Sequence, residues 1–350
     1  MKKKRIAIIF GGCSSEYSVS LQSAYSIISN IDTRCYEPIL MGISREGSWF
    51  RYFGPLDKIQ EDTWHIEEKD CIPVILSPDR RIHGMVELRR EGIRYERIDA
   101  AFPVMHGKNG EDGTVQGLIE LAGIPLIGCG TLSSALCMDK DRAHRLVAAA
   151  DICIPNSVVI KNKLTTMLLY EKTKDLKYPL FVKPIKAGSS FGITKVYERE
   201  DLVEAVKLAF EHDNEVIIEE NIEGFEVGCA ILGNQELIIG EVDEIELSEG
   251  FFDFKEKYTL ESSRIHMPAR IDDTTARRIK QTAAVIYRTL GCKGFARVDM
   301  FLTPDKRIVF NEVNTIPGFT SHSRYPNMMN GIGLPFQELI TKLIEMGLRG

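Results

Sequence analysis

Apolar runs and amphipathic stretches alternate along the first third of the chain. The apolar run Ile6–Phe10 predicts a buried first strand, and apolar positions from about Val19 to Ser29 recur at helical spacing. Further strands are predicted over 36–44 and 99–107, and a helix over 114–123. Alternation of strands and helices is typical of an open α/β sheet, which binds ligands at the carboxyl ends of its strands.

The rest of the chain mixes helices with strands whose order suits antiparallel pairing. Helices are predicted over 131–150, 199–212, 272–290 and 335–345, and strands within 177–196 and over 215–220, 225–233 and 236–247. Residues 249–263 are polar and aromatic without clear periodicity, which indicates a long loop. A second loop is predicted over 315–326.

A predicted hairpin near the end of the chain carries four polar residues on one face. Thr303–Lys306 is a turn signal between two runs of β-branched and apolar residues. A register centred on that turn puts Asp299 opposite Glu312 and Arg297 near Asn314. The period of two then points all four side chains to the same face.

Both faces of this hairpin are otherwise mostly apolar. The face with the carboxylates is expected to carry Phe301, Ile308 and Phe310 as well. The opposite face has Asn311 as its one polar residue. We therefore expect a sheet that is covered on both sides.

The paired carboxylates of the hairpin favour a bound cation. Two carboxylates in apolar surroundings repel unless a positive charge lies between them. Asp, Glu and Asn oxygens are the ligands of a hard ion that keeps water and phosphate in its other positions, which favours Mg²⁺. The competing interpretation is an Arg–Asp salt bridge without any ligand.

Composition and charge narrow the class of protein. The 350 residues are 44% hydrophobic and 27% charged, with a net charge of −6 and no basic run beyond Lys2–Arg5. Neither nucleic acid nor an anionic membrane is therefore expected as a partner. The eight cysteines form no Cys-x-x-Cys pair, and the apolar run at 6–10 is too short for a signal peptide. We expect a cytoplasmic protein with reduced thiols and no disulfides.

Two segments in the middle of the chain suit a nucleotide. Lys183 ends an apolar strand just before the Gly/Ser-rich loop 186–192, where backbone N–H groups can approach phosphate oxygens. Glu219 and Glu220 end another strand, and Glu226 follows a turn, so their carboxylates suit adenine and ribose. The alternative for both segments is a plain loop or strand end with solvated charges.

These features together resemble an ATP-grasp domain. Three further segments narrow the resemblance to the D-alanine–D-alanine ligase family: HGKNGEDGTVQG at 106–117, MDK at 138–140 and NTIPGFTSHS at 314–323. The similarity covers essentially the whole chain. It implies an ATP-grasp fold preceded by a Rossmann-like α/β domain, with units at 1–126, 127–214 and 215–350.

The resemblance also implies a set of site residues. Those implied for ATP are Lys140, Lys183, Ser189, Ser190, Glu219, Glu220, Ile222, Glu226, Phe254 and Asn311. Those implied for two Mg²⁺ ions, which Mn²⁺ could replace, are Asp299, Glu312 and Asn314. Those implied for catalysis are Glu16, Ser189, Arg297, Gly318, Lys257 and Tyr258. Those implied for the amino-acid substrates are Glu16, His106, Phe252, Tyr258, Ser323 and Arg324.

The family divides by its second substrate, which is D-alanine, D-lactate or D-serine. Lys257 and Tyr258 are present in the loop 249–263, which has no histidine, and this argues against D-lactate. Arg324 and Phe252 look similar to the D-serine ligases of vancomycin-resistance clusters. A guanidinium near the acceptor could bond a hydroxyl that D-alanine lacks. Replacing Arg324 with Leu is then expected to weaken D-serine use selectively.

Other interpretations stay open. D-alanine–D-alanine ligase is the main rival, and Arg324 could instead anchor the acceptor carboxylate or pack against Tyr325. A non-catalytic nucleotide-binding protein of the same fold is the alternative from another class. A dinucleotide-dependent dehydrogenase is a further option, but this chain lacks the G-x-G-x-x-G motif that such an enzyme carries after its first strand. By analogy with the family we also expect a homodimer, and a lid formed by 249–263.

Overall fold

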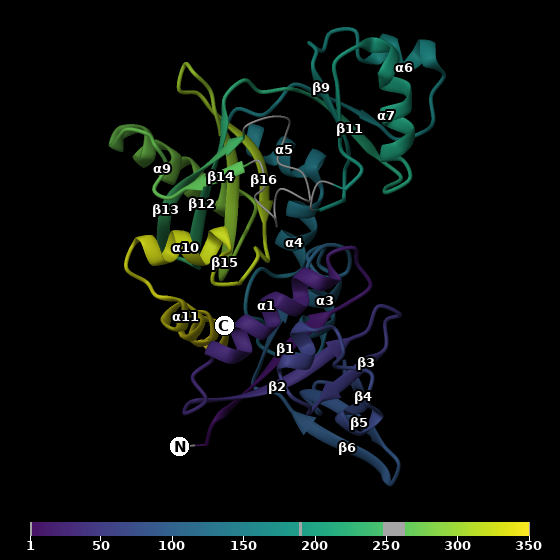
Figure 1. Cartoon of the computed structure of the whole chain (residues 1–350), viewed down its shortest axis with the longest axis vertical. Coiled ribbons are helices and arrows are strands. Elements are labelled where there is room, and N and C mark those ends of the chain that lie inside the picture. Colours follow the sequence, from purple (N-terminus) through teal and green to yellow (C-terminus); the bar gives the residue numbers. More distant parts are fainter. Residues whose placement is uncertain (1, 189–190, 248–262, 350) are drawn as a thin grey trace.

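Three sheets with their helices make up the molecule (Figure 1). The structure is a computed structural model that describes residues 2–188, 191–247 and 263–349. The predicted lid lies outside these residues except for Ser263, which begins a strand. Six of the implied site residues also lie outside them: Ser189, Ser190, Phe252, Phe254, Lys257 and Tyr258.

The N-terminal sheet has seven strands in the order β6-β5-β4-β3-β2-β1-β7. Its strands are β1 (Lys4–Gly11), β2 (Tyr36–Ile43), β3 (Trp49–Tyr52), β4 (Cys71–Leu76), β5 (Gly84–Arg89), β6 (Gly92–Arg97) and β7 (Ala100–Val104). Strand β1 pairs in parallel with β2 and β7, as the alternating pattern predicts. The antiparallel extension β3–β6 was not predicted. Its helices are α1 (Tyr17–Asn30), α2 (Asp57–Gln60) and α3 (Thr114–Leu121).

The central sheet has four antiparallel strands in the order β10-β9-β11-β8. Its strands are β8 (Ser157–Ile160), β9 (Leu180–Pro184), β10 (Thr194–Val196) and β11 (Val216–Glu220). Helices α6 (Thr166–Lys172) and α7 (Leu202–Ala209) belong to the same unit. The predicted unit boundary at 214/215 precedes β11, which nevertheless pairs within this sheet.

Helices α4 (Thr131–Met138) and α5 (Lys140–Ala148) link the N-terminal and central sheets. The sequence predicted one helix over 131–150. Asp139 breaks it, because its backbone is extended and its carboxylate accepts the Arg142 N–H at 3.0 Å as the N-cap of α5. Lys140 therefore stands at the first turn of a new helix and not in the middle of a long one.

The C-terminal sheet has five strands in the order β14-β13-β12-β15-β16. They are β12 (Phe225–Gly233), β13 (Leu237–Leu247), β14 (Ser263–His266), β15 (Phe295–Leu302) and β16 (Ile308–Asn314). The helices are α9 (Asp273–Thr289), α10 (Arg324–Gly331) and α11 (Phe336–Arg349). Helix α10 begins inside the segment predicted as a loop. Its buried face, which includes Tyr325 and Met328, packs on β12 and β13.

The hairpin β15–β16 has the predicted register at its polar end. Arg297 pairs with Asn314 and Asp299 with Glu312. The register then shifts, so that Met300 pairs with Phe310 and Asn311 is the extra residue of a bulge.

Because of the bulge, the face of the sheet predicted for three side chains is wrong. Ile308 and Phe310 pack in the core with Val298, not on the carboxylate face. Asn311 lies beside Glu312 at a cavity. An extra residue in one strand turns every position nearer the turn to the opposite face.

Apolar packing joins the first and last thirds of the chain. Phe102 of β7, Phe295 of β15 and Phe319 form an edge-to-face cluster with ring centroids 5.8–6.2 Å apart. The contact packs the C-terminal sheet against the middle of β7. Within the described residues, no helix has the length and apolar character that crossing a membrane requires.

Candidate active site

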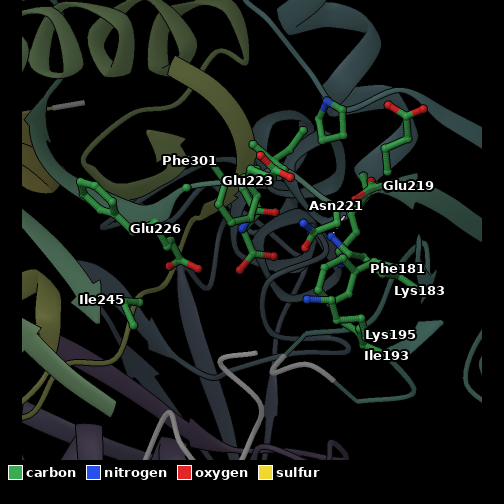
Figure 2. A pocket seen from close by; sticks show the side chains of 18 of the residues that line it. Phe181, Lys183, Ile193, Lys195, Glu219, Asn221, Glu223, Glu226, Ile245 and Phe301 are labelled. Atoms are coloured by element: carbon green, nitrogen blue, oxygen red, sulfur yellow. Dashed lines mark hydrogen bonds and ion pairs between the residues drawn. The ribbon is translucent and has the colours of Figure 1, made fainter. Parts of the chain in front are cut away.

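A cavity of about 570 Å³ lies between the central and C-terminal sheets. Figure 2 shows Lys183, Glu219 and Asn221 on one side of it and Glu226, Ile245 and Phe301 on the other. Its walls combine acidic and basic side chains with apolar ones, which is typical of a site for a small polar molecule.

Eight of the residues implied by the resemblance line this cavity. They are Lys140, Lys183, Glu219, Glu220, Ile222, Glu226, Asn311 and Glu312. They come from α5, β9, β11, β12, β16 and the turn after β11, so only the tertiary fold brings them together. Their individual roles toward ATP stay predictions.

A buried ion pair forms the floor of the cavity. Lys183 Nζ lies 2.6 Å from Glu219 Oε2, across the neighbouring strands β9 and β11. Burial pushes the pKa of Glu219 up, but the Lys183, His144 and Lys140 charges outweigh it and hold that pKa below its ordinary value. The carboxylate therefore stays ionised and keeps the lysine in place.

Lys140 points to the loop that follows β9. Its Nζ donates to the Ala187 carbonyl oxygen at 2.8 Å. The cap at Asp139 sets the direction of α5 and thereby aims Lys140 at that loop. Two ammonium groups thus converge where the Gly/Ser-rich segment begins.

The hairpin carboxylates lie beside this cavity. Glu312 lines it, whereas Asp299 is only 1% exposed. Both Asp299 oxygens accept hydrogen bonds from Arg297, at 2.7–3.0 Å, and Oδ2 also accepts the Asn314 amide at 2.8 Å. The Arg–Asp bridge weighed from the sequence is present, but within one strand and not across two.

A second group of implied residues gathers at the carboxyl ends of β1 and β7. Glu16, just before α1, lies so close to Gly107 and Gly188 that a Cβ on either glycine would fall within 2.3 or 2.7 Å of its Oε2. The Glu16 carboxylate is therefore packed between the N-terminal domain and the Gly/Ser-rich loop. Substituting either glycine would displace it.

His106 joins this group as a neutral side chain. Its Nε2 lies 3.2 Å from Ser23 Oγ, which accepts the Phe319 N–H at 3.2 Å. Burial lowers the pKa of His106 to about 4, and Arg297 lowers it further while the Ile316 backbone opposes. The ring is uncharged at neutral pH and connects α1 to the loop before α10.

Gly318 and Ser323 lie side by side in that loop. A Cβ on Gly318 would meet Ser323 Oγ at 3.1 Å, and the same hydroxyl accepts the Thr320 N–H at 3.0 Å. The loop is thus folded tightly around the serine that the resemblance assigns to a substrate carboxylate.

Three residues of the site were not predicted from the sequence. Glu111 accepts the Gly107 N–H at 2.8 Å and the Ile316 N–H at 3.2 Å, which ties two loops that are 205 residues apart. Burial raises the pKa of Glu111 to about 8, and repulsion from Glu16 adds to this. His144 and Asp243 are the other two. Glu111 lies inside the HGKNGEDG segment, which was the available signal.

Comparisons with known proteins agree with this geometry. Residues 5–129 match the family model described as D-ala D-ala ligase N-terminus, and residues 146–345 match D-ala D-ala ligase C-terminus. The chain belongs to the D-Ala–D-Ala ligase family. Its members are ATP-dependent ligases, so the protein is an enzyme of that class with the ATP-grasp fold.

Three relatives illustrate the range of the family. The crystal structure of VanG D-Ala:D-Ser ligase from Enterococcus faecalis is 58% identical, with a TM-score of 0.92 and coverage of 99% of this chain and 100% of that chain. Vancomycin B-type resistance protein VanB from Enterococcus faecalis is 45% identical over 99% of each chain. A D-alanine–D-alanine ligase from Caldicellulosiruptor bescii is 43% identical over 99% of this chain and 96% of its own.

The donor set of this ligase fits Mg²⁺ bound together with nucleotide. Within the described ranges, no three His, Cys, Asp or Glu side chains are placed to hold an ion by themselves. Two carboxylates and one amide leave positions for water and phosphate, which is how Mg²⁺ is usually held. Asp299 could serve as a ligand once Arg297 releases one of its oxygens.

Arg324 is engaged with carboxylates in this ligase. It is 7% exposed, and its Nε and Nη2 each lie 2.8 Å from an oxygen of Asp243. Its Nη1 donates to Glu226 at 2.8 Å, and Nη2 lies 3.5 Å from Asp299 Oδ1. The guanidinium therefore links the cavity to the hairpin. Its predicted contact with an acceptor hydroxyl stays untested.

Proposed function

We propose that the protein joins D-alanine to D-serine in an ATP-dependent reaction that passes through D-alanyl phosphate. The observation that carries the proposal is the juxtaposition of the Lys183–Glu219 cavity with the Asp299/Glu312 hairpin, which combines cation, carboxylate and amide groups at one place. The 58% identity to a protein named D-Ala:D-Ser ligase supports the choice of acceptor.

The first step would activate a carboxylate. An oxygen of the D-alanine carboxylate attacks the γ-phosphorus of ATP, the bond to the β–γ bridging oxygen breaks, and ADP leaves. Lys140 and Lys183 would neutralise charge on the moving phosphoryl group, and Asp299, Glu312 and Asn314 would hold Mg²⁺. The ion supplies further charge neutralisation there.

The second step would form the amide. The amine of the acceptor attacks the acyl carbon, and a tetrahedral oxyanion develops that needs preorganised donors. Arg297 and the Gly318 backbone N–H are proposed for this role, with Glu16 pairing the ammonium of D-alanine. Loss of inorganic phosphate completes the bond. Ser189, Lys257 and Tyr258 keep the roles that the resemblance implies for them.

The acceptor is the least constrained part of the proposal. D-Alanine is the rival, since the matching family models and one of the relatives are named for D-alanine–D-alanine ligase. D-Lactate is disfavoured by the residues of the loop 249–263. Similarity to VanB further supports a role in vancomycin resistance through altered peptidoglycan precursors. Under this proposal the enzyme is cytoplasmic and homodimeric.

Direct competition between the two acceptors tests the proposal. Purified protein would receive ATP, Mg²⁺, D-alanine and D-serine at equal concentration, and the dipeptides would be separated by mass. An excess of D-alanyl-D-serine is expected. Equal or greater incorporation of D-alanine as acceptor would overturn the serine assignment and favour ordinary cell-wall synthesis. Absence of D-alanine-dependent ADP release would favour a non-catalytic nucleotide-binding protein.

A further inference from the structure

His144 is a buried histidine of α5 that lies between two walls of the nucleotide cavity. It is 2% exposed, with the Phe310 ring 5.4 Å away, edge to face. Its Nε2 lies 2.9 Å from the Asn311 carbonyl oxygen, and its Nδ1 lies 3.5 Å from Glu219 Oε1. The side chain thus bridges β11 and the bulge of β16.

The two oxygens around this ring both lack a proton. A backbone carbonyl can only accept, so Nε2 must carry a hydrogen to bond Asn311. A neutral imidazole has one N–H, which leaves a lone pair on Nδ1 facing the ionised Glu219 carboxylate. Within the described part of the chain, neither Nδ1 nor Glu219 Oε1 has a hydrogen-bond partner. Every neutral tautomer therefore opposes a nitrogen lone pair to an acceptor oxygen.

The imidazolium form removes this conflict. With both nitrogens protonated, the ring donates to the carbonyl and to the carboxylate together. Glu219 of β11 faces the ring, and the charges that act on its carboxylate are those of Lys183 of β9, of Lys140 at the start of α5 and of His144 itself. Strand β16 presents the Asn311 carbonyl and the Phe310 ring to it, and Glu312 follows Asn311 on this strand. Three cations then surround one carboxylate, and a polyphosphate would balance them.

We propose that His144 is a positioning residue of the nucleotide site, which acts as an imidazolium that donates one N–H to the Asn311 carbonyl and the other to the Glu219 carboxylate. This arrangement leaves Glu219 Oε2 for Lys183 and holds the bulge directly before Glu312. The inference rests on the proposed function only in requiring that the cavity binds a nucleotide.

The proposal makes nucleotide affinity depend on a proton. Raising the pH removes the second N–H, releases Glu219 from one of its two anchors and lowers the positive charge of the site. A lysine at position 144 should keep its charge between pH 6 and pH 9, so it should remove the pH dependence of nucleotide affinity.

Titration calorimetry with MgADP between pH 6 and pH 9 tests this. We expect the Kd of the wild type to rise on the order of tenfold across the range. His144→Lys should give a flat profile, and His144→Phe weak binding at every pH. His83→Asn, which removes an imidazole from the N-terminal domain, is the matched control and should follow the wild type. A flat wild-type profile, or a His144→Lys profile parallel to it, overturns the proposal.

An NMR measurement reports the protonation state of the His144 ring in the wild type, even if the His144→Lys or His144→Phe variant folds poorly. Imidazole ¹⁵N resonances of the seven histidines distinguish doubly protonated rings from single tautomers. The ring whose resonances are missing from the spectrum of His144→Gln is that of His144. It should be doubly protonated at pH 6.5 in the MgADP complex, and a neutral ring under these conditions contradicts the inference. Nucleotide binding without D-alanine-dependent ADP release would instead contradict the proposed ligase function and leave His144 intact.

Discussion

At the scale of single residues, burial decides which charges can do chemistry. Glu219 and Lys183 are both buried and paired at 2.6 Å, so each fixes the charge of the other. The sequence shows two charges near strand ends, for which solvated side chains were the alternative interpretation. Only the antiparallel pairing of β9 with β11 makes them partners. Sequence order alone could not supply this contact.

Arg324→Leu is expected to destabilise the protein and not to shift its acceptor preference selectively. The substitution leaves Asp243 and Glu226 without their shared cation, and removing one partner of a buried ion pair costs about 3–5 kcal/mol. Urea unfolding measures the loss, and assays with both acceptors measure selectivity. A stable variant that loses D-serine use alone would restore the expectation drawn from the sequence.

His106 should make stability depend on pH. The pKa of His106 in the folded protein, about 4, is below its value in the unfolded chain. Its contribution to the free energy of unfolding is therefore complete above the unfolded pKa and is lost as the pH falls toward 4. The loss is on the order of 3 kcal/mol for a shift of this size. Urea unfolding at pH 7 and pH 4.5 should show a larger decrease for the wild type than for His106→Gln. Equal decreases would mean that this ring is not held neutral.

At the scale of elements, the pattern of apolar positions predicted most strands but not their irregularities. The polar end of the β15–β16 hairpin follows from period and turn, and its register is confirmed. The bulge at Asn311 could not be predicted, because no glycine or proline marks it. The break at Asp139 had a signal, since aspartate before a helix is a good N-cap. Helix α10 contains Pro326 in its first turn, and because a proline usually indicates a loop, the start of this helix was predicted as one.

Glu111→Gln should impair the chemical step more than nucleotide binding. Above pH 8, where Glu111 is ionised and both of its oxygens accept, Gln can replace only one of these two acceptors, so the loop with Gly318 loses its tie to Gly107. We expect kcat to fall about tenfold or more while the KM for ATP changes little, because misplacing a reacting group by about 1 Å can cost 10²-fold.

A matched variant distinguishes a specific effect of Glu111→Gln on the chemical step from a general loss of order in the protein. Glu120 of α3 also accepts a backbone N–H from another element, that of Thr131 at the start of α4 at 3.1 Å, but its side chain is exposed. Glu120→Gln should leave kcat unchanged. If both variants lose the same activity, or if Glu111→Gln changes only the KM for ATP, Glu111 does not position the catalytic loop.

At the scale of the whole molecule, function depends on what three sheets bring together. Figure 1 shows the three sheets with their helices. The cavity is lined by residues of the second and third sheets, and Glu16 and Glu111 of the N-terminal unit contact the loops that follow β9 and β16. The family and the fold could be recognised from motifs along the chain. The contacts of Arg324, Glu111 and His144 could not, since each joins segments far apart in the sequence.

Isotope transfer is the most direct test of the central claim that this site activates a carboxyl oxygen. The enzyme would turn over ATP, Mg²⁺, D-serine and D-alanine labelled with ¹⁸O in its carboxylate, and the released inorganic phosphate would be weighed by mass spectrometry. Attack of the carboxylate on the γ-phosphorus predicts one ¹⁸O in each phosphate formed with dipeptide. Unlabelled phosphate accompanying dipeptide would contradict a D-alanyl phosphate intermediate and, with it, the mechanism proposed for this site.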